Sequence, residues 1–382
     1  MFTRKKNILK KIKLAIVYQV IFHYRIPFYQ EIENDESLDS ILIYGNGVSD
    51  TKLKNANHSL SKTKKVFSLK IPYGSKKENR FFTFFPTLFF RLIYINPSIL
   101  LVEGSSSIIN LMSAIIYKVI FKKKLIFWSL GKVHNKELTS VRKKLDNLIA
   151  SLEKRADAIF TYSSSGEEYF LNRGIKKNKI FKGINTIDTR KILEMKPPEN
   201  QIKDERFRIL FIGSIIPSKK VKLLIDVFLE LEKNIKNVSL DIIGSGSDYF
   251  ENLKTYYQNS SENLTFHGEI TENLNQFYYK SDIFVLPGLG GLAISEAMAY
   301  GLPVICSIAD GTEKDLIANR KSGIILKEMN FHNLYSELLN LSENPKVLKQ
   351  MGINSKERIE LKFSFENYYN EFKKCVNFLY EN

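Results

Sequence analysis

Residues 282–309 combine a short apolar run, a glycine-rich loop and an acidic residue, a set that could bind an anionic ligand. A short apolar run, Ile283–Leu286, has the length of a buried strand, and a glycine-rich loop follows it. A compact helix is expected from about Leu292 to Tyr300, and Gly301 stands where a left-handed C-terminal cap is expected. A loop between a strand and a helix turns main-chain amides and the helix N-terminus toward an anion. The glycines that allow backbone angles closed to other residues are Gly288, Gly290 and Gly291.

Glu296 lies just inside the predicted helix, close to the amides of Gly290, Gly291 and Leu292. Its carboxylate could accept hydrogen bonds from sugar hydroxyls while phosphates lie at the amides beside it. An acidic residue in the first turn of a helix is also favourable on dipole grounds alone, by about 0.3–1 kcal/mol. The combination nevertheless predicts a sugar nucleotide as the ligand.

Three further loops follow predicted strands in the same half of the chain. One runs from Gly213 to Lys219, a second contains Gly244 and Gly246, and a third begins at His267. The Gly-x-Gly pair lacks the third glycine of a dinucleotide fingerprint, so an oxidoreductase is only weakly indicated. A plain tight turn without a ligand is the alternative for this pair.

The elements that position these loops alternate between strand-like and helix-like segments through both halves of the chain. This alternation predicts the α/β class, with two doubly wound parallel sheets covered by helices. Helices are expected at 105–118 and 138–155. The predicted strands are Lys13–Tyr18, Ser40–Tyr44, Lys65–Leu69, Ser98–Val102, Leu125–Ser129, Ala158–Tyr162, Lys179–Lys182, Phe207–Ile212, Val238–Ile243, Asn263–Phe266, Ile283–Leu286, Val304–Ser307 and Gly323–Leu326.

A linker at residues 196–200 is the expected domain boundary, because its two prolines and polar neighbours suit neither sheet. The predicted first domain is therefore residues 1–195, and the second is residues 201–362. A length of 382 residues also suggests two domains rather than one.

Residues 282–309 resemble the donor-site signature of the retaining GT-B glycosyltransferases of family 4, the glycosyl transferases group 1. That signature is Pro, a loop with a first glutamate, Gly-Leu, a second glutamate followed by Ala-Met-Ala, and Gly-x-Pro-Val. The second glutamate falls on Glu296, but Gly288 stands where the first is expected. The resemblance covers nearly the whole chain. It implies two Rossmann-like domains facing a central cleft, with a C-terminal helix at 363–382 packing back onto the first.

The resemblance also assigns donor-binding residues. In the family, an arginine just after the glycine of the first loop and a lysine five residues further on grip the donor diphosphate. The lysine falls on Lys219, whereas Ser214 takes the arginine position. The other positions implied to lie at the nucleotide or the sugar are Gly213, Gly244, Gly246, the main chain at His267, and Glu313.

In the first half, the resemblance implies an acceptor side with a histidine near the reacting sugar. The family subgroup's histidine position falls on Leu130, so His134 either replaces that histidine or is an exposed loop residue. Arg25, in a Tyr-Arg-x-Pro-Phe run, is expected to contact the acceptor or a phosphate rather than to be a helix-surface charge. The predicted catalytic residues are thus His134, Arg25 and Glu296.

Charge is uneven along the chain and restricts the partners. Residues 1–195 hold 35 Lys and Arg against 16 Asp and Glu, whereas the remainder holds 22 against 25. A basic first half suits nucleic acid, an anionic membrane face or a pyrophosphate-linked lipid. No helix-turn-helix or zinc-finger pattern accompanies it, so nucleic acid is not expected. Two unpaired cysteines fit a reducing compartment, and no Asp-x-Asp pair or histidine spacing predicts a metal.

The stretch from Arg80 to Arg91 is apolar and aromatic, and it has two interpretations. The first, which we prefer, is a core helix of the first domain, and the second is a helix in the membrane interface beside a lipid acceptor. Basic clusters at residues 4–13 and 122–124 favour the second, while no segment is long and apolar enough to span a bilayer. We therefore expect a cytoplasmic protein at the inner face of the cell membrane.

The sequence as a whole predicts a glycosyltransferase that moves a sugar from a nucleotide-diphosphate donor to a lipid-linked or oligosaccharide acceptor. Surface polysaccharide biosynthesis, of capsule or lipopolysaccharide, is the expected setting, and neither a cofactor nor a metal is expected. A GT-B sugar-nucleotide epimerase and a basic nucleic-acid-binding protein are the alternatives.

Overall fold

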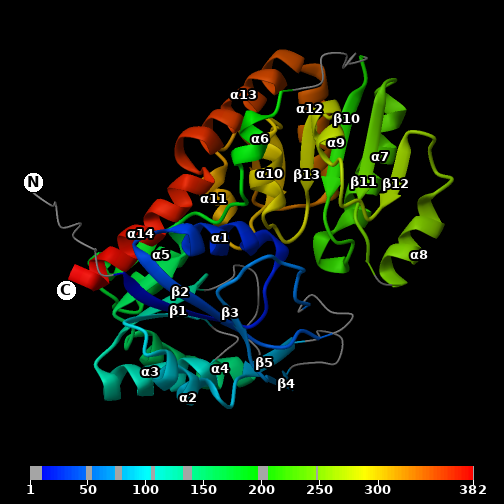
Figure 1. Cartoon of the computed structure of the whole chain (residues 1–382). Coiled ribbons are helices and arrows are strands. Elements are labelled where there is room, and N and C mark those ends of the chain that lie inside the picture. The colour runs from blue at the N-terminus through cyan, green and yellow to red at the C-terminus, as the bar shows by residue number, and fades with distance from the viewer. Residues whose placement is uncertain are drawn as a thin grey trace, which may run out of the picture.

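The computed structural model shows two α/β domains, one above the other in Figure 1. Each is built on a parallel sheet with helices packed against it, which confirms the predicted fold class. The structure describes residues 11–48, 54–73, 80–104, 108–131, 140–196, 205–246 and 248–381.

The first sheet has the order β3-β2-β1-β6-β7-β8-β9, and all its strands run parallel. Helices α1 and α14 cover one face, and α2 and α3 cover the other. The strands are β1 (Ile12–Tyr18), β2 (Leu38–Tyr44), β3 (Thr63–Lys65), β6 (Ile99–Glu103), β7 (Lys124–Ser129), β8 (Ala158–Thr161) and β9 (Ile180–Lys182). The helices are η1 (His23–Arg25), α1 (Ile26–Asn34), α2 (Leu88–Ile95), α3 (Ile108–Phe121), α4 (Ser140–Glu153), α5 (Ser164–Asn172), η3 (Lys177–Lys179) and α6 (Arg190–Glu194).

An antiparallel hairpin of β4 (Leu69–Tyr73) and β5 (Arg80–Phe84) lies beside the first sheet and corrects two predictions. The strand expected at Lys65–Leu69 is wrong, because β3 ends at its first residue and β4 begins at its last. The core helix expected from Arg80 to Arg91 is also wrong, since the segment forms β5 and then enters α2. Phe81 and Phe82 favour a strand as much as a helix, and apolar content alone could not separate the two.

The second sheet has the order β12-β11-β10-β13-β14-β15, again all parallel. Five of its six strands begin and end where predicted, because each is a short apolar run bounded by turn residues. The strands are β10 (Phe207–Ile212), β11 (Val238–Ile243), β12 (Leu264–Gly268), β13 (Ile283–Leu286), β14 (Val304–Ser307) and β15 (Gly323–Leu326). The helices are η4 (Pro217–Lys219), α7 (Val221–Asn234), α8 (Asp248–Tyr257), α9 (Asn275–Lys280), α10 (Ala293–Ala299), α11 (Thr312–Leu316), α12 (Phe331–Glu343), α13 (Pro345–Lys362) and α14 (Phe365–Glu381).

The chain returns to the first domain through its last helix, which runs down from the upper domain in Figure 1. Phe365, Tyr368 and Phe372 of α14 are buried in the core of the first domain. Asp35 anchors the same helix, accepting hydrogen bonds from Tyr369 (2.8 Å) and Lys373 (2.6 Å). Of the predicted linker 196–200, only Lys196 lies within the described residues.

Both sheets reverse their strand order at the centre, between β1 and β6 and between β10 and β13. In open parallel sheets, ligands bind outside the carboxyl ends of the strands at such a reversal. The two reversals therefore mark where each domain should contribute to a site.

Candidate active site

A cleft of about 650 Å³ lies between the two domains at these strand ends. The second domain contributes the loops after β10 and β13, and the first contributes the loops after β1, β6 and β7. Eight predicted site residues line it: Arg25, Gly213, Ser214, Lys219, Gly290, Gly291, Leu292 and Glu296. We call the second-domain side, which carries the predicted donor-binding residues, the donor half, and the first-domain side, which carries the residues predicted to face an acceptor, the acceptor half.

The loop after β13 packs directly on the turn η4 of the neighbouring loop. The amide of Leu289 donates to the carbonyl of Ser218 at 2.9 Å. A Cβ added to Gly288 would lie 2.1 Å from that carbonyl oxygen and 2.4 Å from Cα of Lys219. Glycine is thus required at position 288 for space, and a glutamate would force the two loops apart.

The prediction that the loop glycines adopt unusual backbone angles is wrong. Positive φ occurs at Gly213 and at the helix cap Gly301, where φ is +82°, but not at Gly288, Gly290 or Gly291. The cap at Gly301 is confirmed. At 288 the glycine makes room for another backbone, and at 291 nothing lies within 4 Å of the place of a Cβ.

Main-chain amides of this loop are available to a ligand. Within the described residues, the N–H groups of Gly290, Gly291 and Leu292 donate no hydrogen bond to the chain, and all three residues line the cleft. They precede α10, whose first residue is Ala293. Free amides at the start of a helix favour an anion such as a phosphate.

Glu296 lies in the first turn of α10 with its side chain at the cleft. Burial raises the pKa of Glu296, while the hydroxyl of Tyr278 favours the charged form. Tyr278 is itself fixed by stacking on Tyr300, with ring centroids 4.5 Å apart. The carboxylate lies at the cleft wall, where it can accept hydrogen bonds from hydroxyl groups.

Lys219 supplies the positive charge of the donor half. Its Nζ donates to the carbonyl of Leu289 and, at 3.4 Å, to that of Gly290. The ammonium group therefore lies at the glycine loop, beside the free amides. Ser214, at the family's arginine position, lines the same wall.

Gly244 and Gly246 support the donor half from behind and do not line the cleft. A Cβ on Gly244 would lie 1.9 Å from the carbonyl oxygen of Gly213, and one on Gly246 would lie 2.1 Å from that of Ile215. The amide of Ile215 donates to the carbonyl of Ser245 at 2.8 Å. These glycines let the loops after β10 and β11 touch.

His267 and Glu313 likewise lie outside the cleft lining. The imidazole of His267 is hydrogen-bonded to Asp241 (Nε2 to Oδ1, 2.6 Å). Glu313 is buried and accepts from the amides of Ala309 (3.0 Å) and Gly311 (3.2 Å). Burial raises the pKa of Glu313, and the bond from Ala309 opposes that rise. Its neighbour Asp310 lines the cleft instead.

Arg25 is buried in the acceptor half among aromatic rings. Its Nη1 donates to the hydroxyl of Tyr368 at 2.9 Å, which ties the cleft to α14. Its Cζ lies 4.7 Å from the ring centroid of Trp128 and 5.0 Å from that of Tyr162. Burial disfavours the charge, but the surrounding tyrosines outweigh it and the pKa of Arg25 is raised. The guanidinium is a fixed cation and not a helix-surface charge.

Glu103, at the end of β6, is an acidic residue of the acceptor half that the motif analysis did not single out. Its carboxylate accepts from the amide (3.3 Å) and the side chain (3.2 Å) of Gln19. Burial raises the pKa of Glu103 to about 7, against the hydrogen bonds of Gln19 and the charges of Arg25 and Lys70. A signal was present: Glu103 is the single acidic residue in 80–131, and it directly follows a strand.

Two positions were considered for the histidine of the acceptor half, and only one of them is among the described residues. His134 lies outside the described residues, and Leu130, at the subgroup's histidine position, lines the cleft. His23, in η1, also lines it, with its ring edge on Tyr24. Aromatic side chains, among them Phe22 and Tyr24, line the cleft beside Arg25, as suits a sugar ring.

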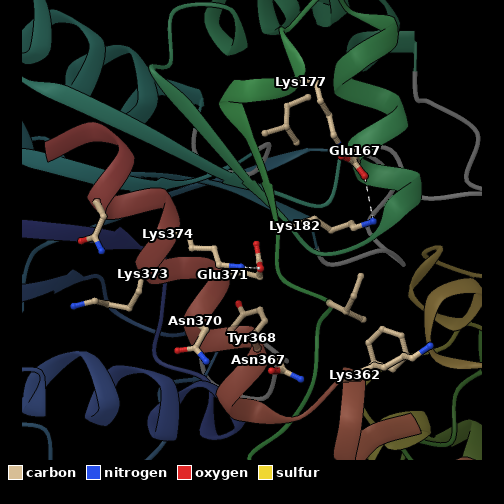
Figure 2. A pocket seen from close by; sticks show the side chains of 14 residues that line it. Glu167, Lys177, Lys182, Lys362, Asn367, Tyr368, Asn370, Glu371, Lys373 and Lys374 are labelled. Atoms are coloured by element: carbon tan, nitrogen blue, oxygen red, sulfur yellow. Dashed lines mark hydrogen bonds and ion pairs between the residues drawn. The ribbon is translucent and has the colours of Figure 1, made fainter. Parts of the chain in front are cut away.

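A second pocket, of about 720 Å³, lies between β9, α5 and α14 (Figure 2). It is rich in lysine, but most of the lysine charges are paired with carboxylates of the same pocket. Lys177 and Lys182 pair with Glu167, and Lys374 pairs with Glu371 (2.7 Å). The cleft, where free amides, a cation and a carboxylate converge, is the better candidate site.

No group of three or more His, Cys, Asp or Glu side chains among the described residues is placed to hold a metal ion. Among the helices that the structure describes, none combines the length and the apolar character needed to cross a bilayer.

Comparison with known proteins gives consistent matches. Residues 194–358 match the family model for glycosyl transferases group 1. An uncharacterized glycosyltransferase of Methanocaldococcus jannaschii is 26% identical over 91% of this chain and 92% of its own length. The capsular polysaccharide biosynthesis glycosyltransferase CapM of Staphylococcus aureus is 25% identical over 47% of this chain and 48% of CapM.

Among solved structures, the Anabaena protein HepE in complex with UDP superposes with a TM-score of 0.72. The match covers 96% of this chain and all of HepE, at 14% identity. At that identity the likeness establishes the two-domain architecture.

Proposed function

We propose that this chain, a glycosyltransferase of the GT-B fold whose second domain carries the group 1 module, transfers a sugar from a nucleotide diphosphate to a saccharide acceptor. The observation that carries the proposal is the wall formed by the amides of Gly290–Leu292, Lys219 and Glu296.

In this proposal the donor diphosphate lies at the amides of Gly290, Gly291 and Leu292. The leaving group gains negative charge as the glycosidic bond breaks, and fixed amides with a neighbouring ammonium group stabilise that charge. Lys219 exchanges a carbonyl partner for a phosphate oxygen. The new hydrogen bond is stronger because both of its partners are charged. Glu296 accepts hydrogen bonds from the ribose hydroxyls.

We also propose that the reaction needs no metal ion held by the protein, because the same groups can stabilise the leaving diphosphate. Retention of anomeric configuration is also part of it and rests on the resemblance of residues 282–309 to the retaining enzymes. The anomeric configuration of the product, measured by NMR, tests retention directly.

The acceptor half suits a saccharide. Tyr24, half-buried at the cleft, offers an aromatic ring, and Glu103 offers an acceptor for a sugar hydroxyl. Arg25 adds a fixed cation, which suits a saccharide joined to a phosphate or pyrophosphate. We therefore propose a lipid-linked acceptor, used in surface polysaccharide synthesis at the inner face of the cell membrane. The name of CapM, a capsular polysaccharide enzyme, agrees with that setting.

Thermal stabilisation by a panel of uridine and guanosine diphosphosugars tests the donor side. We expect at least one donor to stabilise the native chain and Glu296→Gln to lose most of that stabilisation. Glu251→Gln is the matched control, because Glu251 lies in the first turn of α8 but outside the cleft. If no sugar nucleotide stabilises the protein, the proposal fails.

Product analysis separates transfer from its alternatives. Release of nucleoside diphosphate that depends on a glycan acceptor supports transfer. Isomerisation of the donor without acceptor would identify an epimerase. Tight, salt-sensitive DNA binding without affinity for nucleotide sugars would identify a nucleic-acid-binding protein.

A further inference from the structure

The first domain carries a large apolar surface on two adjacent helices, α2 and α3, which pack against each other. Both lie along the lower edge of the first domain in Figure 1, away from the second domain. We call it the α2–α3 surface. Its exposed residues are Phe90, Ile93 and Tyr94 of α2 and Ile109, Met112, Ile116, Val119 and Ile120 of α3.

Helix α3 is apolar on both of its faces. Leu111, Ala114 and Ile115 point into the core, as a helix covering a sheet requires. On the opposite face, Val119 is 65% exposed and Ile120 59% exposed. The exposed positions 109, 112, 116, 119 and 120 recur at helical spacing, so they form one continuous stripe. Water-soluble surfaces rarely leave such a stripe uncovered.

Helix α2 extends the stripe with aromatic side chains. Tyr94 is 87% exposed and Phe90 71% exposed. Tyrosine and other amphipathic rings favour the boundary between lipid headgroups and acyl chains. The platform beneath is firmly held: Asn110 of α3 accepts from the amide of Phe85 at 2.8 Å and donates to the carbonyl of Thr83 at 3.1 Å.

Charge around the surface selects an anionic partner. Residues 80–131 contain six Lys and Arg and one acidic residue, Glu103, which faces the cleft. Arg91 and Lys122 are exposed on or beside the two helices, while Lys118 is paired with Asp157 at 2.8 Å. A second copy of the chain would bring two such basic surfaces together, and the repulsion disfavours self-association.

We propose that the α2–α3 surface docks on an anionic lipid bilayer, with the apolar stripe at the headgroup boundary and the lysines on anionic headgroups. The inference rests on the proposed function for its purpose. Helix α3 follows closely on Glu103 and Gly104, both at the cleft, so the docking surface leads up to the acceptor half. A lipid-linked saccharide could then enter that half while its lipid stays in the membrane.

Cosedimentation with vesicles of phosphatidylglycerol and phosphatidylcholine tests the proposal. We expect the native chain to bind anionic vesicles, more weakly as salt rises. Replacing Val119 and Ile120 together by Ser should lower the partition coefficient by at least about tenfold. The control replaces Tyr256 and Leu361 by Ser. Both are at least as exposed as Val119 and Ile120 but lie in the second domain, so the partition coefficient should change by less than about twofold.

A second variant tests the charge. Lys122→Asn with Lys123→Gln should lower anionic-vesicle binding by about 10–30-fold at low salt. Asn suits position 122, whose φ is +52°. Native binding that is absent, or unchanged in both variants, overturns the proposal. So does a native dimer that the Val119 and Ile120 changes convert to monomer without lipid.

Donor binding separates this proposal from the proposed function. All variants should keep the native stabilisation by the sugar nucleotide and transfer to a water-soluble acceptor. If both are kept while vesicle binding never occurs, the docking surface alone is wrong. If no sugar nucleotide binds the native chain, the failure lies with the proposed function.

Discussion

The two halves of the cleft are built in different ways. The donor half uses main chain: free amides at Gly290–Leu292, glycines that let loops touch, and two charged side chains. The acceptor half uses side chains, with Arg25 fixed among aromatic rings and Glu103 fixed by hydrogen bonds from Gln19. A main-chain site suits a diphosphate, which is the same in every donor, whereas a side-chain site can be altered for each acceptor.

The two halves also differ in how they are assembled. The donor wall comes mainly from one contiguous stretch and the turn η4 that packs on it. The acceptor half draws on β1, β6 and β7 and, through the hydroxyl of Tyr368, on α14. A change at a glycine of the donor half should therefore act through backbone position, whereas a change at Lys219, at Glu296 or in the acceptor half should act through a single group.

Gly288→Glu should give the largest effect. It restores the glutamate of the family signature, yet its Cβ would overlap the backbone of Ser218 and Lys219. Displacing the anion-binding amides by even 1 Å should lower transfer on the order of 100-fold. Leu289→Glu adds the same charge at an exposed neighbour and should be milder. Full activity in Gly288→Glu would show that the tight loop contact is not needed.

Lys219→Met should come next, because Lys219 is the one cation among the described residues of the donor half that line the cleft. Loss of a charge-assisted hydrogen bond of about 1.5–3 kcal/mol should weaken donor affinity by about 10–100-fold. Calorimetric titration of the donor measures it. Lys220→Asn is the comparison, because Lys220 is exposed and its φ is +52°. Equal losses in both variants would mean that the diphosphate does not lie at Lys219.

Glu103→Gln should give a smaller effect, confined to the acceptor half. We expect transfer to fall about tenfold, as the loss of one hydrogen bond to a charged group implies, with donor affinity unchanged. Because the pKa of Glu103 is about 7, native activity should rise with pH through neutrality as the carboxylate forms, and the variant should lose that dependence. A native pH profile that persists in the variant would place the titrating group elsewhere.

The pH dependence of stability should be opposite to that of activity. With its pKa raised from 4.5 to about 7 in the fold, Glu103 holds a proton that the unfolded chain has lost, so stability falls as pH rises through this range. The difference in melting temperature between Glu103→Gln and the native chain should therefore shift in favour of the variant between pH 4 and pH 8. At pH 8 the variant should melt at the higher temperature. If Glu103 served stability alone, Glu103→Gln would melt at a lower temperature than the native chain at pH 8.

Most of the predicted donor-binding residues line one cleft, and they could be predicted together because the evidence for them is local. An apolar run, a glycine loop, Glu296 and Gly301 follow one another in the chain, and five strands of the second sheet were predicted to the residue. What sequence reasoning missed was contact between loops. The reason for Gly288 becomes visible only when η4 lies against it.

The acceptor half was harder to predict for a topological reason. Gln19 and Glu103 are 84 residues apart and meet because β1 and β6 are neighbours in the sheet. Arg25 and Tyr368 are 343 residues apart and meet because α14 returns to the first domain. The hairpin β4–β5 was missed because its apolar residues read equally well as a helix.

A crystal structure with an intact sugar nucleotide tests the central claim most directly. The account predicts phosphate oxygens within hydrogen-bonding distance of the amides of Gly290, Gly291 or Leu292, and the ribose hydroxyls on Glu296. A nucleotide bound elsewhere, for example in the lysine-rich pocket beside α14, or a donor wall closed by side chains, would contradict it.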